Sequence, residues 1–173
     1  METSIPTPSS PSAAGLASAA SDRQRALAGQ YLTLRLGQES YAIDILRVQE
    51  IRSYEQPTRM VNSPSFIKGV VNLRGVIVPI VDLRLKLHIG EADYTEFTVV
   101  IILNIHGTVV GAVVDAVSDV VTLGADAIKA APQFDSGIEA RFVLGLAHLG
   151  ERTLIVMDME SLLSHAELGI SAK

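Results

Sequence analysis

The residues that this 173-residue chain lacks exclude several classes of function. It contains no cysteine, which rules out disulfide bonds, thiolate metal sites, iron–sulfur clusters and cysteine nucleophiles. Tryptophan is absent and aromatic residues make up only 5% of the chain, so stacking surfaces for bases or sugars are not expected. Acidic residues outnumber basic ones, and the formal net charge of −5 at pH 7 argues against a nucleic-acid-binding protein.

Long hydrophobic runs are also scarce. The N-terminus has neither the basic region nor the apolar core of a secretory signal. The apolar stretch from Thr98 to Val114 carries Asn104-Ile105-His106-Gly107 at its centre, a pattern typical of a hairpin turn. Two buried strands explain this stretch better than one spanning helix. We therefore expect no membrane insertion, and the absence of cysteine fits a cytoplasmic location.

Branched aliphatic side chains are what the chain has in abundance. Hydrophobic residues make up 48% of the sequence, and valine and isoleucine together account for 33 residues. These residues fall mostly in short runs, which favours strands over helices. Turn signals recur at intervals of about ten residues, which predicts a barrel or sandwich rather than an α/β fold.

Residues 1–28 differ in composition from the rest of the chain. Proline, serine and alanine dominate this segment, and it cannot bury enough apolar surface to offset the entropy of ordering. The sequence predicts a disordered tail that can be removed without loss of stability or function, followed by a folded domain over residues 29–168.

The folded part contains an internal repeat. Residues 67–82 align without gaps on residues 143–158, an offset of 76, so that Gly69 matches Gly145 and Asp82 matches Asp158. A duplicated β unit of about 65–75 residues predicts two small barrel-like lobes. Their approximate bounds are 29–93 and 94–168, and the groove between them is the expected binding surface.

Motifs that carry chemistry are missing. The sequence has no Walker, dinucleotide, nucleophile-elbow or zinc-protease motif, and no glycine-rich loop for phosphate. Its four histidines are at least 17 residues apart, so their spacing does not support a metal site. Asp115 and Asp119 are interpreted as strand-end and turn acids, and Asp82 and Asp158 as helix N-caps. We expect a binding module that has no enzymatic activity, cofactor or metal.

Two charged residues are harder to explain by structure alone. Arg74 occupies the tip of the turn Leu73-Arg74-Gly75, where the repeat has Gly150, so the backbone does not require an arginine. Glu50 interrupts an otherwise apolar strand. We predict that both face the groove between the lobes, close to each other and to a partner.

Three segments, Ile43–Arg52, Phe66–Arg84 and Val113–Val120, closely resemble the CheW family of bacterial chemotaxis coupling proteins. The resemblance extends from about Gln30 to Leu163. It implies an all-β fold with short helices, built as two intertwined five-stranded SH3-like β-barrel lobes. It also implies a non-enzymatic adaptor that joins the cytoplasmic tips of methyl-accepting chemoreceptors to the regulatory domain of the histidine kinase CheA. Further CheW copies in the array rings are implied partners, and the array recruits the protein to the membrane.

The resemblance also assigns site residues. Carried over by motif, the receptor-binding residues are Val48, Glu50, Arg74, Val117 and Val120. The kinase and ring contacts are Lys68 and Gly69 on one side, and Lys129 and Phe134 on the other. Where this chain has Lys129 the family commonly has arginine; lysine keeps the charge but loses the bidentate fork. Phe134 lies in a loop-like context and is expected to serve assembly rather than the core.

Three alternatives remain open at this point. The chain could be the regulatory domain of a CheA-type kinase, although its 173 residues hold no phosphotransfer or ATP-binding region. It could be a CheV-like protein, although no receiver domain is present. It could be a small enzyme, for which the missing nucleophile and metal cluster are the discriminating features.

Overall fold

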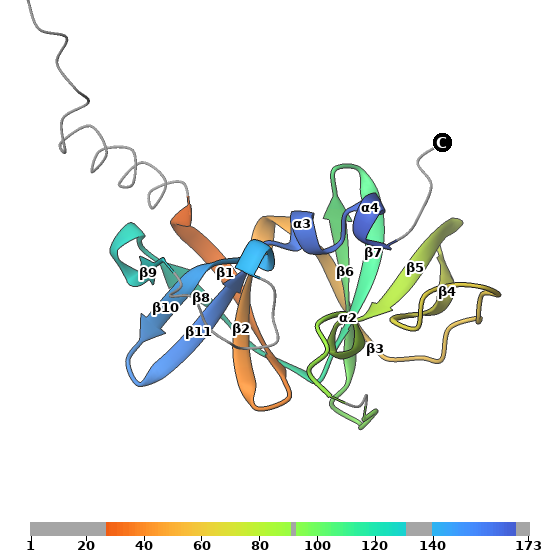
Figure 1. The fold of residues 1–173 in the computed structure, drawn as a ribbon, viewed down its shortest axis with the longest axis horizontal. Coiled ribbons are helices and arrows are strands. Elements are labelled where there is room, and N and C mark those ends of the chain that lie inside the picture. Colours follow the sequence, from red (N-terminus) through yellow and green to blue (C-terminus); the bar gives the residue numbers. More distant parts are fainter. Residues whose placement is uncertain (1–26, 91–92, 131–139, 169–173) are drawn as a thin grey trace, which may run out of the picture.

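The computed structural model describes residues 27–90, 93–130 and 140–168, which form a β-rich fold of two sheets (Figure 1). The strands are β1 (Gly29–Leu36), β2 (Glu39–Asp44), β3 (Val48–Ser53), β4 (Ile67–Leu73), β5 (Val76–Asp82), β6 (Val99–Ile105), β7 (Thr108–Val114), β8 (Ala116–Leu123), β9 (Ile128–Lys129), β10 (Val143–Leu149) and β11 (Arg152–Met157). The helices are the short α2 (Leu83–Lys86), α3 (Met159–Leu162) and α4 (His165–Leu168), with 3₁₀ turns η1 (Ile45–Arg47), η2 (Ala125–Ala127) and η3 (Ala140–Phe142). The predicted all-β class with short helices is confirmed.

The two sheets exchange strands. Sheet A has the order β8-β1-β2-β11-β10-β9, and sheet B has the order β3-β6-β7-β5-β4. Strand β3 follows β2 in the chain but pairs with β6 in sheet B, whereas β8 follows β7 but pairs with β1 in sheet A. Each sheet therefore draws strands from both halves of the chain. The expected lobe bounds of 29–93 and 94–168 do not coincide with the sheets, because sheet B is the continuous segment from β3 to β7, while sheet A combines β1 and β2 with β8 to β11.

The internal repeat is confirmed by matching irregularities in the two sheets. The β4–β5 hairpin shifts register between Ile67 and Gly69, and the β10–β11 hairpin shifts between Val143 and Gly145. Both glycines let another backbone approach closely. A Cβ on Gly69 would lie 2.1 Å from the carbonyl oxygen of Thr58, and one on Gly145 would lie 2.5 Å from that of Lys129. Only glycine fits at these two positions.

The largest hydrophobic cluster lies between the sheets, because it takes buried residues from β1 and β2 of sheet A and from β5, β6 and β7 of sheet B. Successive side chains of a strand point to opposite faces of its sheet, so neighbouring residues enter different clusters. Leu32 and Leu34 of β1 enter the shared cluster, while Tyr31 enters a smaller cluster made by sheet A alone. On β6, Ile101 enters the shared cluster and Ile102 enters a smaller cluster of sheet B.

Several local expectations are settled by the structure. Asp82 caps α2 by accepting the Arg84 N–H at 3.0 Å, and Asp158 caps α3 by accepting the Ser161 N–H at 3.2 Å, as predicted. The sequence also predicts a short helix over residues 66–68, which is wrong, since β4 begins at Ile67. It predicts one helix over 159–168 with Gly169 just beyond its end; the structure has two short helices there, α3 and α4, and Gly169 lies outside the described residues.

Most of the predicted tail, residues 1–26, lies outside the described residues, but its last part does not. Leu27 packs against the sheet A cluster, and its carbonyl oxygen accepts a hydrogen bond from the Tyr31 hydroxyl. The folded domain therefore begins at least two residues before the expected boundary at residue 29.

A buried polar network joins the two sheets. Arg84, only 4% exposed, pairs with Asp115 and lies 3.5 Å from Asp82, whose side chain is fully buried. Asp115 also accepts the N–H of Gly37 at 2.6 Å, which ties the β1–β2 turn of sheet A to α2. The Tyr94 hydroxyl donates to Asp82 at 2.8 Å. Asp82 and Asp115 are therefore more than caps and strand-end acids.

We expect Gly69→Ala to lower the free energy of unfolding by more than about 2 kcal/mol, because alanine combines an unfavourable φ with a steric clash. Gly69 has φ +145°, and the added Cβ would overlap the Thr58 backbone. Gly124→Ala is the matched control, since Gly124 has φ −78° and no atom near the added Cβ. Urea denaturation measures both variants, and equal midpoints would contradict this account of Gly69.

We expect Arg84→Met to cost about 3–5 kcal/mol of stability, because the buried carboxylate of Asp82 and the partly buried carboxylate of Asp115 would lose their cation. Arg35→Met, at an exposed position of β1, is the control and should change stability by less than about 0.5 kcal/mol. Thermal and urea unfolding of the two variants test this. A small effect at Arg84 would mean that the network does not hold the two sheets together.

Candidate functional site

Glu50 and Arg74 meet although they belong to opposite edges of sheet B. Glu50 lies on β3, one edge strand, and Arg74 lies in the turn after β4, the other edge strand. Their side chains form an ion pair, so the sheet curls until its two edges approach each other. The structure thus brings together the two charged residues that the sequence predicted to be close.

This ion pair is accessible to a partner. The Arg74 side chain is 71% exposed and the Glu50 side chain 28% exposed. Glu50 also accepts a hydrogen bond from Arg52 at 3.2 Å. Partial desolvation opposes ionisation, but the hydrogen bonds from Arg52 and Arg74 outweigh it and lower the pKa of Glu50. The carboxylate is therefore charged at neutral pH and held between two guanidinium groups.

The backbone at Arg74 does not favour an arginine. Its φ is +52°, and the following Gly75 has φ +86°, while Asn72 Oδ1 accepts the Gly75 N–H at 2.8 Å. A residue other than glycine in the left-handed region costs about 1–2 kcal/mol. The matching position of the repeat is Gly150, with φ +64°. The local backbone conformation therefore does not account for an arginine at position 74. The ion pair that its side chain forms with Glu50 does require an arginine or another cation.

The three predicted valines lie on two strands, one in each sheet. Val48, on β3, and Val117, on β8, are half-buried and pack against the shared core. Val120, further along β8, is 51% exposed. Strands β3 and β8 each follow a crossing between the sheets, and each forms an edge of its sheet. The predicted receptor residues therefore lie on both sheets, the ion pair on sheet B and the exposed Val120 on sheet A.

The predicted kinase and ring residues lie on outer strands. Lys68 is half-buried on β4, and its Nζ lies 5.6 Å from the centroid of the Tyr94 ring. Gly69 is buried and has a structural role in the close approach to Thr58. Lys129 is exposed on β9, at the far edge of sheet A. Phe134 lies outside the described residues.

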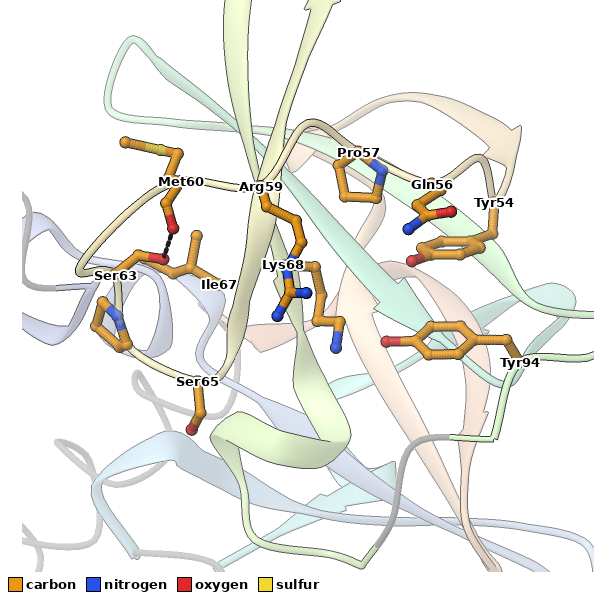
Figure 2. Close-up of a pocket in the computed structure, with 11 residues that line it drawn as sticks. Tyr54, Gln56, Pro57, Arg59, Met60, Ser63, Ser65, Ile67, Lys68 and Tyr94 are labelled. Atoms are coloured by element: carbon orange, nitrogen blue, oxygen red, sulfur yellow. Dashed lines mark hydrogen bonds between the residues drawn. The ribbon is translucent and has the colours of Figure 1, made fainter.

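A cavity beside Lys68 was not predicted from the sequence. It has a volume of about 480 Å³ and is lined mainly by residues 54–68 together with Tyr94 (Figure 2). The rings of Tyr54 and Tyr94 stack in it with centroids 4.5 Å apart. One feature of the sequence could have pointed to this cavity: two of the four tyrosines, Tyr54 and Tyr94, fall outside the segments that read as strands.

Among the described residues, no helix is long and apolar enough to cross a membrane.

Comparison with known proteins agrees with this architecture. Residues 30–167 match the family model described as the CheW-like domain. The chain is 51% identical to the chemotaxis protein CheW of Klebsiella aerogenes over 157 residues, covering 91% of this chain and 95% of the relative. It is 35% identical to the probable chemotaxis protein CheW of Rhizobium etli, covering 80% and 89%.

A solved structure gives the same result. The scaffolding protein TtCheW of Thermoanaerobacter tengcongensis superposes with a TM-score of 0.74 at 30% identity, covering 80% of this chain and 94% of that one. The match to the family model takes in every described strand from β2 to β11 and nearly all of β1. The resemblance seen in the sequence motifs is therefore confirmed, and the chain belongs to the CheW-like domain family.

Proposed function

We propose that this protein is a non-enzymatic adaptor that couples chemoreceptors to the histidine kinase CheA in bacterial chemotaxis. The observation that carries the proposal is the 51% identity to a chemotaxis protein CheW over nearly the full length of both chains. The relatives named as chemotaxis protein CheW and the CheW scaffolding protein structure favour this function over the alternative of a regulatory domain of a CheA-type or CheV-type protein. The adaptor acts in the cytoplasm and reaches the membrane through receptor arrays.

The receptor tip binds at the Glu50–Arg74 surface. An exposed ion pair flanked by apolar side chains has little value to the fold itself, because water screens it. When a receptor helix covers the pair, water is removed and the same charges interact more strongly with polar groups of the partner. Val48, on β3 with Glu50, and Val117 and Val120, on β8, supply apolar area to the receptor contact. This surface is the part of the adaptor that selects the receptor.

The kinase and ring contacts use the two outer ends of the molecule. Lys68 lies near the sheet B end and Lys129 at the sheet A end, and Figure 1 shows β4 and β9 on opposite sides of the fold. The repeat relates these ends, since Thr58 pairs with Val70 and Lys129 pairs with the matching Leu146. Two different surfaces at opposite ends permit head-to-tail contacts, which generate rings. The kinase regulatory domain and this adaptor alternate in such a ring.

Reconstitution tests the proposed function. The protein is mixed with receptor signalling fragments and purified CheA, and co-sedimentation and kinase activity are measured. We expect a ternary assembly in which the kinase is activated only when all three components are present. Failure to assemble or activate with any cognate receptor and kinase would refute the adaptor role.

We expect Arg74→Gly to weaken receptor binding by about tenfold or more, because the binding surface loses its guanidinium. The variant should fold at least as stably as the parent, since glycine accepts φ +52° without strain. Kinase binding should not change. Pull-down with receptor fragments and thermal unfolding measure these effects.

His106→Gly is the matched control for this substitution. His106 occupies the same kind of turn, with φ +51°, and Asn104 accepts the Gly107 N–H at 2.8 Å as Asn72 does at Gly75. The control should relax the backbone equally and leave receptor binding intact. Equal losses in the two variants, or unfolding of Arg74→Gly, would mean that Arg74 serves the fold rather than the receptor.

We expect Lys129→Arg to strengthen ring assembly and Lys129→Glu to weaken it, because arginine restores a bidentate donor and glutamate reverses the charge. Lys129 is exposed on the two-residue strand β9, so neither change should alter stability by more than about 0.5 kcal/mol. Electron microscopy of reconstituted arrays measures ring order, and receptor pull-down serves as the control. Unchanged arrays in both variants would remove Lys129 from the ring contact.

A further inference from the structure

The cavity beside Lys68 has an unusual charge. Among its eleven lining residues are two cations, Arg59 and Lys68, but no aspartate or glutamate, although the chain as a whole is acidic. No carboxylate in the described part of the chain forms an ion pair with either of them. Gln56, Ser63 and Ser65 add polar groups to the same wall. The cavity is thus a local excess of positive charge in a negatively charged protein.

The backbone forces the two cations together. Thr58 pairs with Val70 in an antiparallel bridge, which places Arg59 across from Gly69 and beside Lys68. Because Gly69 has no side chain, the Cα of Arg59 lies only 3.2 Å from the position that a Cβ would occupy. Like charges on neighbouring strands repel each other and destabilise the pairing. A bound anion would remove this repulsion.

Nearby groups do not supply that negative charge. The Tyr94 hydroxyl donates to Asp82, which is fully buried and also accepts the Arg84 N–H at the start of α2. Burial, reinforced by the hydrogen bond to Asp82, raises the pKa of Tyr94, so its hydroxyl stays neutral. In Figure 2 the head groups of Arg59 and Lys68 point into the cavity, and the tyrosine hydroxyls point toward Lys68.

We propose that this cavity binds the phosphate or carboxylate group of a small organic anion. The Arg59 guanidinium donates two parallel hydrogen bonds to the oxyanion, and the Lys68 ammonium supplies a second positive charge. The Ser65 hydroxyl fixes the rest of the molecule, together with the Ser63 hydroxyl oxygen, which can accept a hydrogen bond while its proton is donated to the Met60 carbonyl. A volume of about 480 Å³ lies in the range of small-molecule sites and exceeds what a bare ion needs. This site is built from side chains, not from the glycine-rich loop that the sequence lacks, and it does not depend on the adaptor function.

Amide NMR titration of the full chain tests the proposal at neutral pH. The probes are inorganic phosphate and acetate, each compared with sodium chloride at the same ionic strength. We expect saturable shifts with phosphate, centred on residues 54–68 and Tyr94. Acetate should bind more weakly, because a doubly charged anion satisfies two cations better than a singly charged one.

Variants separate a built site from general screening. Arg59→Gln and Lys68→Gln should each raise the phosphate dissociation constant by about tenfold or more, while the exposed-lysine control Lys129→Gln leaves it unchanged. Shifts that follow ionic strength alone, or equal affinity in all variants, would overturn the proposal. So would a wild-type chain that shows no saturable response while both variants lose kinase binding, since the cations would then serve a carboxylate of the partner protein.

Discussion

The two crossings of the chain between the sheets, after β2 and after β7, are the constraint on which the rest of this structure depends. Sheet B is the continuous segment β3–β7, and sheet A is completed only when β8–β11, which follow that segment, join β1 and β2, which precede it. The largest core cluster lies between the sheets for the same reason, and the sheet-specific clusters are smaller. The two lobes are thereby fixed in one relative orientation. An adaptor with contacts at both ends needs such a fixed geometry, because a flexible joint would cost entropy each time a partner bound.

The internal duplication shows which positions serve the fold and which are free to serve binding. Positions that serve the fold are identical in the two repeats. Gly69 and Gly145 each allow another stretch of backbone to approach closely. The carbonyl oxygens of Phe66 and Phe142 each accept the N–H of the aspartate that caps the next helix, Asp82 and Asp158, at 2.8 Å. Solvent-facing positions differ instead: Arg74 corresponds to Gly150, and Lys68 to the partly exposed Leu144. A duplicated scaffold has in this way acquired two chemically different ends, which is what an asymmetric, head-to-tail contact requires.

The sequence predicted the hairpins, the repeat and the helix caps because these features are local and have a clear period or turn signal. It could not predict the two crossings of the chain between the sheets, because the alternation of side chains along β3 and β8 is the same whichever sheet these strands join. The network around Arg84 was missed because an aspartate that pairs across the fold has the same local sequence as one that ends a strand. The cavity beside Lys68 was missed for a similar reason: Arg59, Lys68 and Tyr94 converge only through the Thr58–Val70 bridge and the Tyr54 stack.

Arg74 and Arg84 show how burial and backbone cost together separate a binding residue from a structural one. Arg84 is almost fully buried between two carboxylates, where an unpaired charge would be costly, so the fold itself requires it. Arg74 is mostly exposed, its partner Glu50 is held by a second arginine, and its φ of +52° would suit glycine better. The exposed ion pair of Arg74 therefore adds little to the stability of the fold, while its positive φ lowers that stability. We therefore propose that a partner outside the chain accounts for Arg74 and binds at the Glu50–Arg74 pair.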